Sequence, residues 1–283
     1  MSLDSSRPLA GRTLIMSGGS RGIGEAIALK AAAAGANIAL IAKTAEPHPS
    51  LPGTLFTAAA KIEEAGGQAL PIVGDVRDDE QVAAAVAQTV ERFGGIDIVV
   101  NNASALDITR TEDLGMKKYD LMQDINARGS FLLSKLSIEH LRASSNAHIL
   151  TLSPPLNLDP KWFDQIGTGY TISKFSMSLV TLGLARELQA DGIAVNSLWP
   201  RTTIDTAAVR NILGDDLVSA SRTAEIMADA AMEIITGPVG GPTGQFYIDD
   251  AVLTAAGVTD LAKYQVSPGP VDELELDFWV ESH

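Results

Sequence analysis

The sequence predicts a doubly wound α/β fold, in which helices cover both faces of a parallel sheet of about seven strands. Short runs of Val, Ile and Leu alternate with alanine-rich helical stretches, giving about five βα units in succession. Strands that are apolar throughout indicate a sheet buried on both faces. A chain of 283 residues, 46% of them hydrophobic, can bury one large core. These features are typical of a Rossmann-type sheet.

Each expected element has a local pattern behind it. Apolar runs predict strands at residues 13–17, 37–42, 68–73, 96–100, 148–152 and 193–198, with a last strand in the sequence GQFYID at 244–249. Helical patterns predict helices at 25–35, 54–65, 79–93, 119–141 and 168–190. Gly35 is expected to end the first helix, because glycine readily adopts the left-handed conformation that follows a helix.

The last third of the chain is less regular. After Pro200 the pattern is helical and irregular to about Gly237, and residues 202–217 lie where such nucleotide folds carry a mobile lid. No long linker divides the chain, so one domain is expected over residues 9–250. Residues 251–283 form an acidic extension that is expected to pack on the same domain or on a neighbouring subunit.

Composition excludes several classes of function. The chain has no cysteine, which excludes disulfides, thiolate metal sites and cysteine nucleophiles, and its four histidines show no metal-ligand spacing. A formal net charge of −14 disfavours nucleic acid and anionic membranes as partners. No apolar run is long enough for a membrane span, and neither end reads as a signal peptide or a peroxisomal address. The cytoplasm is the expected location.

The first strand runs into the glycine-rich sequence SGGSRGIG at residues 17–24 and then into a helix. Glycines between a strand and a helix allow a tight turn, close approach of the backbone to a pyrophosphate, and close packing of helix on sheet. An ordinary tight turn is the alternative, but the strand–loop–helix context favours a nucleotide. The expected cofactor contacts in this loop are Gly18, Ser20, Arg21, Gly22, Ile23 and Gly24.

The end of the second strand bears on which nicotinamide cofactor binds. A carboxylate there would bond the ribose 2′-hydroxyl and repel a 2′-phosphate, but the strand ends Ala42-Lys43-Thr44 without an acid. Lys43 and Arg21 supply two positive charges for a phosphate, although a solvated lysine is the plain alternative for Lys43. The sequence therefore favours NADP(H) over NAD(H).

Tyr170 and Lys174 form a Y-x-x-x-K motif at the start of the helix at 168–190. Positions i and i+4 share one face of a helix, so the ammonium group is expected one turn from the phenol. A free phenol has a pKa of about 10, and a nearby cation would lower it toward the range useful for proton transfer. The motif alone is a common coincidence; its place after the fifth strand gives it weight.

Over residues 9–250 the sequence resembles the short-chain dehydrogenases/reductases. The matching pieces are SGGSRGIG, GDV, NNAS, DINARGSF, YTISK and NSLWP, and a closer resemblance to one subgroup extends over nearly the whole chain, including the VSPGP of the tail. The resemblance implies that Asn126 anchors a water in a proton relay through Lys174, that Lys43 contacts NADP, and that the protein is a homodimer or homotetramer. It also implies cofactor contacts at Asp75, Val76, Asn102, Ala103, Tyr170, Lys174, Pro200 and Thr203.

The sequence departs from the family pattern at two places near the expected active site. The usual NNAG reads NNAS, which puts a side chain at Ser104. The family's serine that polarises the substrate carbonyl is matched by Ser153, but strict strand register would align Pro154 with it. Downstream, Arg201 replaces the usual glycine, where it is either an attractor for an anionic substrate or a surface or subunit contact.

The sequence as a whole predicts an NADP(H)-dependent oxidoreductase that moves hydride between the nicotinamide and a carbonyl or alcohol carbon. Tyr170 would donate the proton, Ser153 hold the oxygen, and Lys174 with Asn126 restore the proton. The substrate is expected to be an apolar small molecule, given Trp162, Phe163, Leu198 and Trp199, which could equally be core. A nucleotide-binding regulator or lipid-binding protein with vestigial activity is the alternative, motivated by the two departures.

Overall fold

The computed structural model describes residues 7–47, 53–207, 209–210 and 218–281, and part of the expected lid, together with the extreme ends of the chain, lies outside them. All pairings in its seven-stranded sheet are parallel, and the strand order is β3-β2-β1-β4-β5-β6-β7. The predicted doubly wound fold of about seven strands is therefore confirmed. The strands are β1 (Thr13–Ser17), β2 (Asn37–Ala42), β3 (Gln68–Val73), β4 (Ile98–Asn101), β5 (His148–Thr151), β6 (Ala194–Trp199) and β7 (Phe246–Ile248).

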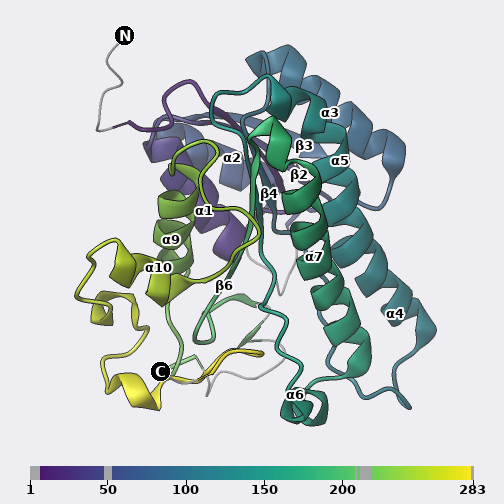
Figure 1. Ribbon diagram of the computed structural model, residues 1–283, viewed down its shortest axis with the longest axis vertical. Coiled ribbons are helices and arrows are strands. Elements are labelled where there is room, and N and C mark those ends of the chain that lie inside the picture. Colours follow the sequence, from purple (N-terminus) through teal and green to yellow (C-terminus); the bar gives the residue numbers. More distant parts are fainter. Residues whose placement is uncertain (1–6, 48–52, 208, 211–217, 282–283) are drawn as a thin grey trace.

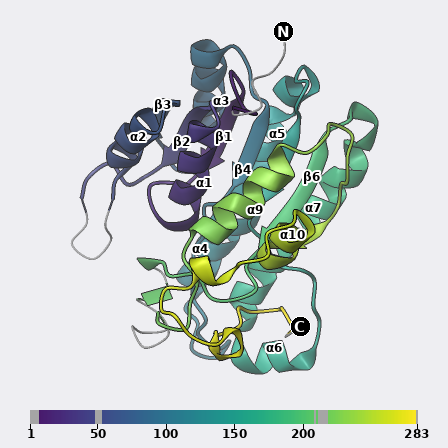
Figure 2. The ribbon, with the colours of Figure 1, turned by 90° about the vertical axis from the view of Figure 1, so that its left-hand side faces the viewer.

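Helices cover both faces of this sheet (Figures 1 and 2). One face packs against α1 (Gly22–Ala33), α2 (Leu55–Glu64) and α9 (Glu225–Ile235), with α10 (Asp249–Ala255) beside α9. The other face packs against α3 (Asp79–Phe93), α5 (Gly129–Arg142) and α7 (Thr168–Glu187). Because both faces are covered, central strands such as β1 and β6 are buried at every position, which explains their continuous apolar runs.

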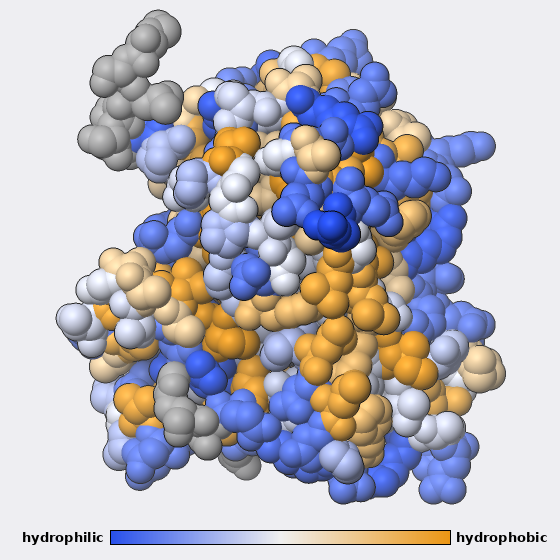
Figure 3. All heavy atoms as spheres, in the orientation of Figure 1, coloured by the Kyte–Doolittle hydropathy of each residue, from blue (hydrophilic) through white to orange (hydrophobic). Residues whose placement is uncertain are grey.

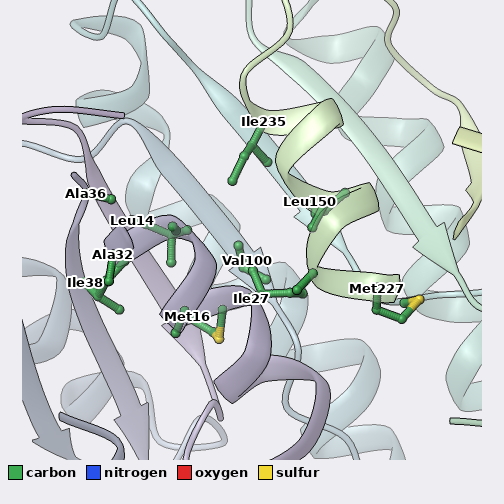
Figure 4. Close-up of a cluster of buried hydrophobic side chains, with 14 of the residues drawn as sticks. Leu14, Met16, Ile27, Ala32, Ala36, Ile38, Val100, Leu150, Met227 and Ile235 are labelled. Carbon is green, nitrogen blue, oxygen red and sulfur yellow. The ribbon is translucent and has the colours of Figure 1, made fainter. Parts of the chain in front are cut away.

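The core between β1 and the first helix layer is made of small and branched side chains. Leu14 and Met16 of β1 point toward Ile27 of α1 and Met227 of α9, and all four are fully buried (Figure 4). Alanines on α1 let that helix approach the sheet and α9 closely. This packing fixes the start of α1 directly above the end of β1, where the glycine loop lies.

One predicted element differs in its internal structure. The helix expected at 119–141 consists of α4 (Met116–Met122), a π-helical stretch at Gln123–Arg128, and α5. A π-helical stretch widens the helix by one residue per turn and often marks a functional site. Asn126 lies within it and is fully buried. A repeating apolar pattern cannot reveal this local change in winding, because the residues on both sides keep a helical period.

The C-terminal extension folds back onto its own domain. The Glu275 carbonyl accepts a hydrogen bond from the Thr203 N–H (2.9 Å), and the Glu281 carbonyl accepts one from the Arg201 guanidinium (2.9 Å). Arg201 also pairs with Asp250, with 3.1 Å between Nε and a carboxylate oxygen. In Figures 1 and 2 this yellow segment lies at the same end of the molecule as α6 (Pro160–Gln165). Arg201 therefore holds the tail in place.

None of the described helices is long and apolar enough to cross a membrane. Within the same ranges, no group of three or more His, Cys, Asp or Glu side chains is arranged to hold a metal ion.

Candidate active site

The candidate site lies at the carboxyl end of the sheet, where β1 and β4 are neighbours but their following helices go to opposite faces. This is the switch point at which such sheets bind ligands. Asn102 follows β4, and its side-chain amide donates to the Ser17 carbonyl at the end of β1 (3.1 Å). The Ser17 hydroxyl in turn accepts from the N–H groups of Asn102 and Ala103 (3.1 Å each). These bonds tie the two strand ends together beneath the glycine loop.

The glycine loop requires glycine at several positions. Gly18 and Gly22 have φ of +79° and +59°, in the left-handed region that other residues avoid. A Cβ on Gly18 or Gly24 would lie 2.6 or 2.5 Å from the Asn102 side chain, so neither position has room for one. The Arg21 guanidinium donates to the Gly53 carbonyl (3.0 Å), while its buried Nε has no hydrogen-bond partner. A bare loop with an unpartnered cationic donor fits an anionic nucleotide.

The region expected to receive a 2′-phosphate contains charged side chains besides Lys43. Lys43 lies at the end of β2 with its ammonium 3.2 Å from the Asp75 carboxylate, and its side chain is 59% exposed. Asp75 also accepts from Arg77 at 2.6 Å, and chiefly this bond holds the pKa of Asp75 far below its usual range. Arg77 is a further cation beside Lys43 that the sequence reasoning missed. Val76 is buried and packs against Gly129.

A pocket opens beside the glycine loop and receives residues from the ends of four strands (β1, β4, β5 and β6) and from the C-terminal tail. Its lining joins Ile23 of the loop, Tyr170 and Lys174 of α7, and the aromatic ring of Trp199 at the end of β6. The other lining residues are Asn102, Ser104, Leu106, Ile108, Leu152, Pro200, Thr203, Ile204, Thr206, Val209, Met227, Glu275, Leu276, Asp277 and Phe278. The lining is mostly apolar, with a few polar groups, as is common in sites for small molecules.

Tyr170 and Lys174 lie one helical turn apart on α7, and both side chains are buried at the pocket wall. The Lys174 ammonium donates to the Leu152 carbonyl (2.6 Å) and lies 4.8 Å from the centre of the Trp199 ring. The Tyr170 ring packs 5.8 Å from the Trp279 ring, centre to centre. The structure therefore brings together the pair that the Y-x-x-x-K motif predicted.

Burial dominates the protonation of this pair. Removal from water, with a smaller contribution from the charge of Asp277, raises the pKa of Tyr170 far above 10, although the Ser104 hydroxyl lowers it somewhat. Burial lowers the pKa of Lys174 to about 7, against a smaller opposite effect of Asp277. The expectation that a cation lowers the phenol pKa is thus outweighed in this structure. Tyr170 therefore keeps its proton at neutral pH.

Asn126 supports the loop after β4 through its side chain. Its amide donates to the Ala105 carbonyl and to the Ser173 hydroxyl (2.9 Å each), and its oxygen accepts from the Ala105 N–H (2.7 Å). These bonds fix the position of neighbouring Ser104 and of α7. Asn126 is not among the residues that line the pocket. Its side chain therefore acts here by positioning, and the expected water relay stays a prediction.

The structure does not place Ser153 where a substrate could reach it. Ser153 is fully buried, outside the pocket lining, and its hydroxyl lies 2.8 Å from the Ser197 hydroxyl, which donates to Thr181 (2.9 Å). The preceding residue, Leu152, lines the pocket instead. The geometry thus opposes the expected carbonyl-holding role of Ser153, because its hydroxyl is engaged between β6 and α7.

The remaining expected residues divide between pocket and core. Pro200 and Thr203 line the pocket, but the N–H of Thr203 donates to Glu275 and its carbonyl accepts from Arg222, so neither backbone group is free for a carboxamide. Trp199 lines the pocket, as expected for an apolar site. Trp162 and Leu198 are core residues, Phe163 lies outside the lining, and Arg201 is engaged with Asp250 and the tail.

Sequence reasoning missed the contribution of the tail. Residues 275–278 line the pocket, and Trp279 packs against Tyr170, Trp199 and Phe175 with ring centres 5.4 to 5.8 Å apart. The DFW sequence at 277–279 was the available signal, since aromatic residues in an acidic tail need a surface to cover.

Comparison with known proteins identifies the family. The sequence pattern of the short chain dehydrogenases matches residues 12–216, so the chain belongs to the short chain dehydrogenase family. Membership in this family supports an oxidoreductase that uses a nicotinamide cofactor.

Individual relatives agree with this assignment. Hydroxysteroid dehydrogenase-like protein 2 of Danio rerio is 55% identical over 267 residues, which are 94% of this chain and 64% of the relative. The chain thus spans just under two thirds of that protein. A short chain dehydrogenase structure from Mycobacterium thermoresistibile is 54% identical, with a TM-score of 0.91 and 96% of each chain covered. One from Burkholderia cenocepacia, in complex with NADP, is 28% identical, with a TM-score of 0.73, covering 85% of this chain and 97% of that one.

Replacing Gly18 by alanine should weaken nucleotide binding. The new Cβ would lie 2.6 Å from the Asn102 amide at a φ of +79°, so the loop and the strand tie beneath it must shift. We expect the Kd for NADPH to rise at least about tenfold, because the loop backbone must approach the pyrophosphate closely. Isothermal titration calorimetry measures this. Gly95→Ala, where nothing lies within 4 Å of the new Cβ, is the control. Equal Kd values for the two variants would contradict the assigned role of the loop.

Proposed function

We propose that the protein is an NADPH-dependent reductase of apolar carbonyl compounds, which can also run toward oxidation of the corresponding alcohols. The observation that carries the proposal is the pair Tyr170 and Lys174, one turn apart on α7, in an apolar pocket beside the glycine loop. NADPH, when bound, supplies the hydride that reduces the carbonyl carbon.

In this reaction the chain positions the substrate and moves the proton. The Tyr170 phenol donates its proton to the carbonyl oxygen as that oxygen gains negative charge. Lys174, one turn away, stabilises the phenolate that remains, because a neighbouring cation favours the charged form of a phenol. The glycine loop with Arg21 and Lys43 would hold the phosphates of the cofactor. The surrounding apolar side chains exclude water from the reacting atoms.

The pocket lining supports an apolar substrate. Leu106, Ile108 and Leu152 face the space beside Tyr170, and Trp199 and Phe278 add aromatic surface. Such a lining binds hydrocarbon parts of a substrate through burial, worth about 25 cal/mol per Å² of apolar surface.

Replacing Tyr170 by phenylalanine tests the proposed function. The variant keeps the ring that packs on Trp279 but loses the proton donor, so turnover should fall at least about a hundredfold while NADPH binding persists. The measurement is NADPH consumption with a panel of apolar ketones and aldehydes. Tyr247→Phe, a tyrosine outside the pocket lining, serves as the control. Undiminished turnover in the Tyr170 variant would refute the mechanism. Tight NADPH binding without any turnover by the wild type would favour the nucleotide-binding regulator.

The cofactor preference is a second part of the proposal. Lys43 and Arg77 lie side by side at the ends of β2 and β3, sharing Asp75 between them. One solved relative is a complex with NADP, which agrees with this preference. A phosphate on the ribose would give these cations an anionic partner from the ligand.

Lys43→Ala should therefore raise the Kd for NADPH about tenfold and leave the Kd for NADH nearly unchanged. Fluorescence titration with each cofactor measures the two constants. Lys61→Ala is a matched control, because Lys61 also pairs with one carboxylate, Glu25 at 2.8 Å, and is similarly exposed. An equal rise in Kd for NADPH and NADH would show that Lys43 does not contact the 2′-phosphate.

An apolar strip on the outer face of α7 supports the expected homo-oligomer. Ile172, Leu179 and Leu182 are 42%, 58% and 38% exposed, and Phe131 on α5 is 48% exposed. Figure 3 shows an orange strip running down this face of the molecule. Patches of this kind on a folded domain mark interaction surfaces. We propose that a homodimer or homotetramer forms through α5 and α7.

Leu179→Glu should shift the protein toward the monomer, because a buried unpaired charge destabilises an interface. Sedimentation velocity measures the distribution of species. Phe56→Glu, an apolar and 51% exposed site on α2, which covers the opposite face of the sheet, should leave it unchanged. A wild-type protein that is monomeric at micromolar concentration would rule out this interface.

A further inference from the structure

The pocket contains a carboxyl group that the proposed reaction does not use. Asp277 comes from the C-terminal tail and lines the pocket together with Tyr170 and Lys174. Its N–H donates to the Arg201 carbonyl (3.0 Å), and the carbonyl of its neighbour Phe278 accepts from the Trp199 indole (2.9 Å). The backbone is thus held on both sides of Asp277, so its carboxyl group has a defined place in the site.

The reaction needs a hydrogen bond that the expected residue cannot make. Reduction places negative charge on the carbonyl oxygen, and a fixed donor aimed at that oxygen stabilises the transition state. The Ser153 hydroxyl is engaged with Ser197 and lies outside the pocket lining. The Lys174 ammonium donates to the Leu152 carbonyl. The proposed reaction therefore needs a second hydrogen-bond donor to the substrate oxygen, besides Tyr170.

We propose that Asp277, as a neutral carboxylic acid, donates a hydrogen bond to the substrate oxygen, in the role that Ser153 cannot fill. This inference rests on the proposed reductase function. One carboxyl oxygen of Asp277 already accepts from the Phe278 N–H at 2.7 Å, so the proton resides on the other oxygen. Tyr170 still transfers the proton to the product; Asp277 keeps its own and only stabilises the developing charge.

The surroundings of Asp277 favour the protonated form up to neutral pH. Burial is the main reason that the pKa of Asp277 rises to about 7; the Phe278 N–H, Lys174 and Trp199 lower it, and the charge of Asp249 raises it. Tyr170, Lys174 and Asp249 are the titratable groups that interact with it. Because the protonated acid is the donor, the reductive rate should fall as pH rises through about 7.

Ser104 is the alternative to Asp277 as the hydrogen-bond donor to the substrate oxygen. Its hydroxyl lies near the Tyr170 phenol and lowers the pKa of that group. Ser104 also lines the pocket and is exposed at its edge. If Ser104 holds the substrate oxygen, its removal rather than that of Asp277 will slow hydride transfer.

The test is single-turnover hydride transfer from NADPH to a ketone that the wild type reduces. Asp277→Leu, of similar size but without a donor, should slow the step about a hundredfold with NADPH affinity unchanged. Asp277→Asn should retain the rate within about tenfold, because its amide N–H can donate while its oxygen still accepts from Phe278. Asp272→Asn, on the same tail but outside the pocket lining, is the control.

The pH profile adds a readout that a merely structural role would not change. In the wild type, loss of rate above neutrality combines deprotonation of Asp277 and of Lys174, whose pKa is also about 7. Asp277→Asn removes one of these ionisations, so its rate should fall less steeply with pH. This comparison holds even if the leucine variant fails to fold.

Three results would overturn the inference. One is a wild-type rate in Asp277→Leu, and another is an unchanged pH profile in Asp277→Asn. The third is a hundredfold loss in Ser104→Ala with none in the Asp277 variants. With Tyr170→Phe inactive in the same assay, each of these leaves the reductase function standing. If the wild type binds NADPH but reduces no carbonyl, the proposed function itself fails.

Discussion

The parallel direction of all seven strands is the constraint on which the site depends. Because every strand ends at the same edge of the sheet, the loops after β1, β4, β5 and β6 converge there, although they are far apart in the sequence. The bonds from Asn102 and Ala103 to Ser17 lock the two central strand ends together, and bare glycines at 18 and 24 leave room for the Asn102 side chain. The glycine loop and the pocket therefore both rest on the joined ends of β1 and β4.

Low polarity in the pocket decides how its ionisable groups behave. Burial pushes the pKa of Lys174 down and that of Asp277 up, so both titrate near 7, while Tyr170 holds its proton more firmly than a free phenol does. In water, the side chains of Lys and Asp do not change protonation near neutral pH. In this pocket they do, and the charge of one then affects the pKa of the other. The chemistry follows from where the fold places these side chains as much as from their identity.

The C-terminal tail forms part of the wall of the candidate pocket. Arg201, which stands where the family usually has glycine, pairs with Asp250 and bonds the tail backbone, and Trp279 stacks among Tyr170, Phe175 and Trp199. Arg201, expected either to attract an anionic substrate or to be a surface or subunit contact, anchors the tail of its own domain. Its bonds to the tail hold Asp277 and Phe278 at the pocket.

The fold class, the glycine loop and the Tyr170–Lys174 pair could be predicted from local patterns, because apolar strands, glycines between a strand and a helix, and i, i+4 spacing involve residues close together in the chain. Long-range packing, by contrast, set the position of the Ser153 hydroxyl. It is engaged with Ser197 of β6, and Leu152 lines the pocket instead. The same packing brings Arg77 to the Asp75 carboxylate that Lys43 contacts, and it brings Asp277 of the tail into the pocket that Tyr170 lines, although the two residues lie far apart in the sequence. Such contacts depend on long-range packing, which no local pattern records.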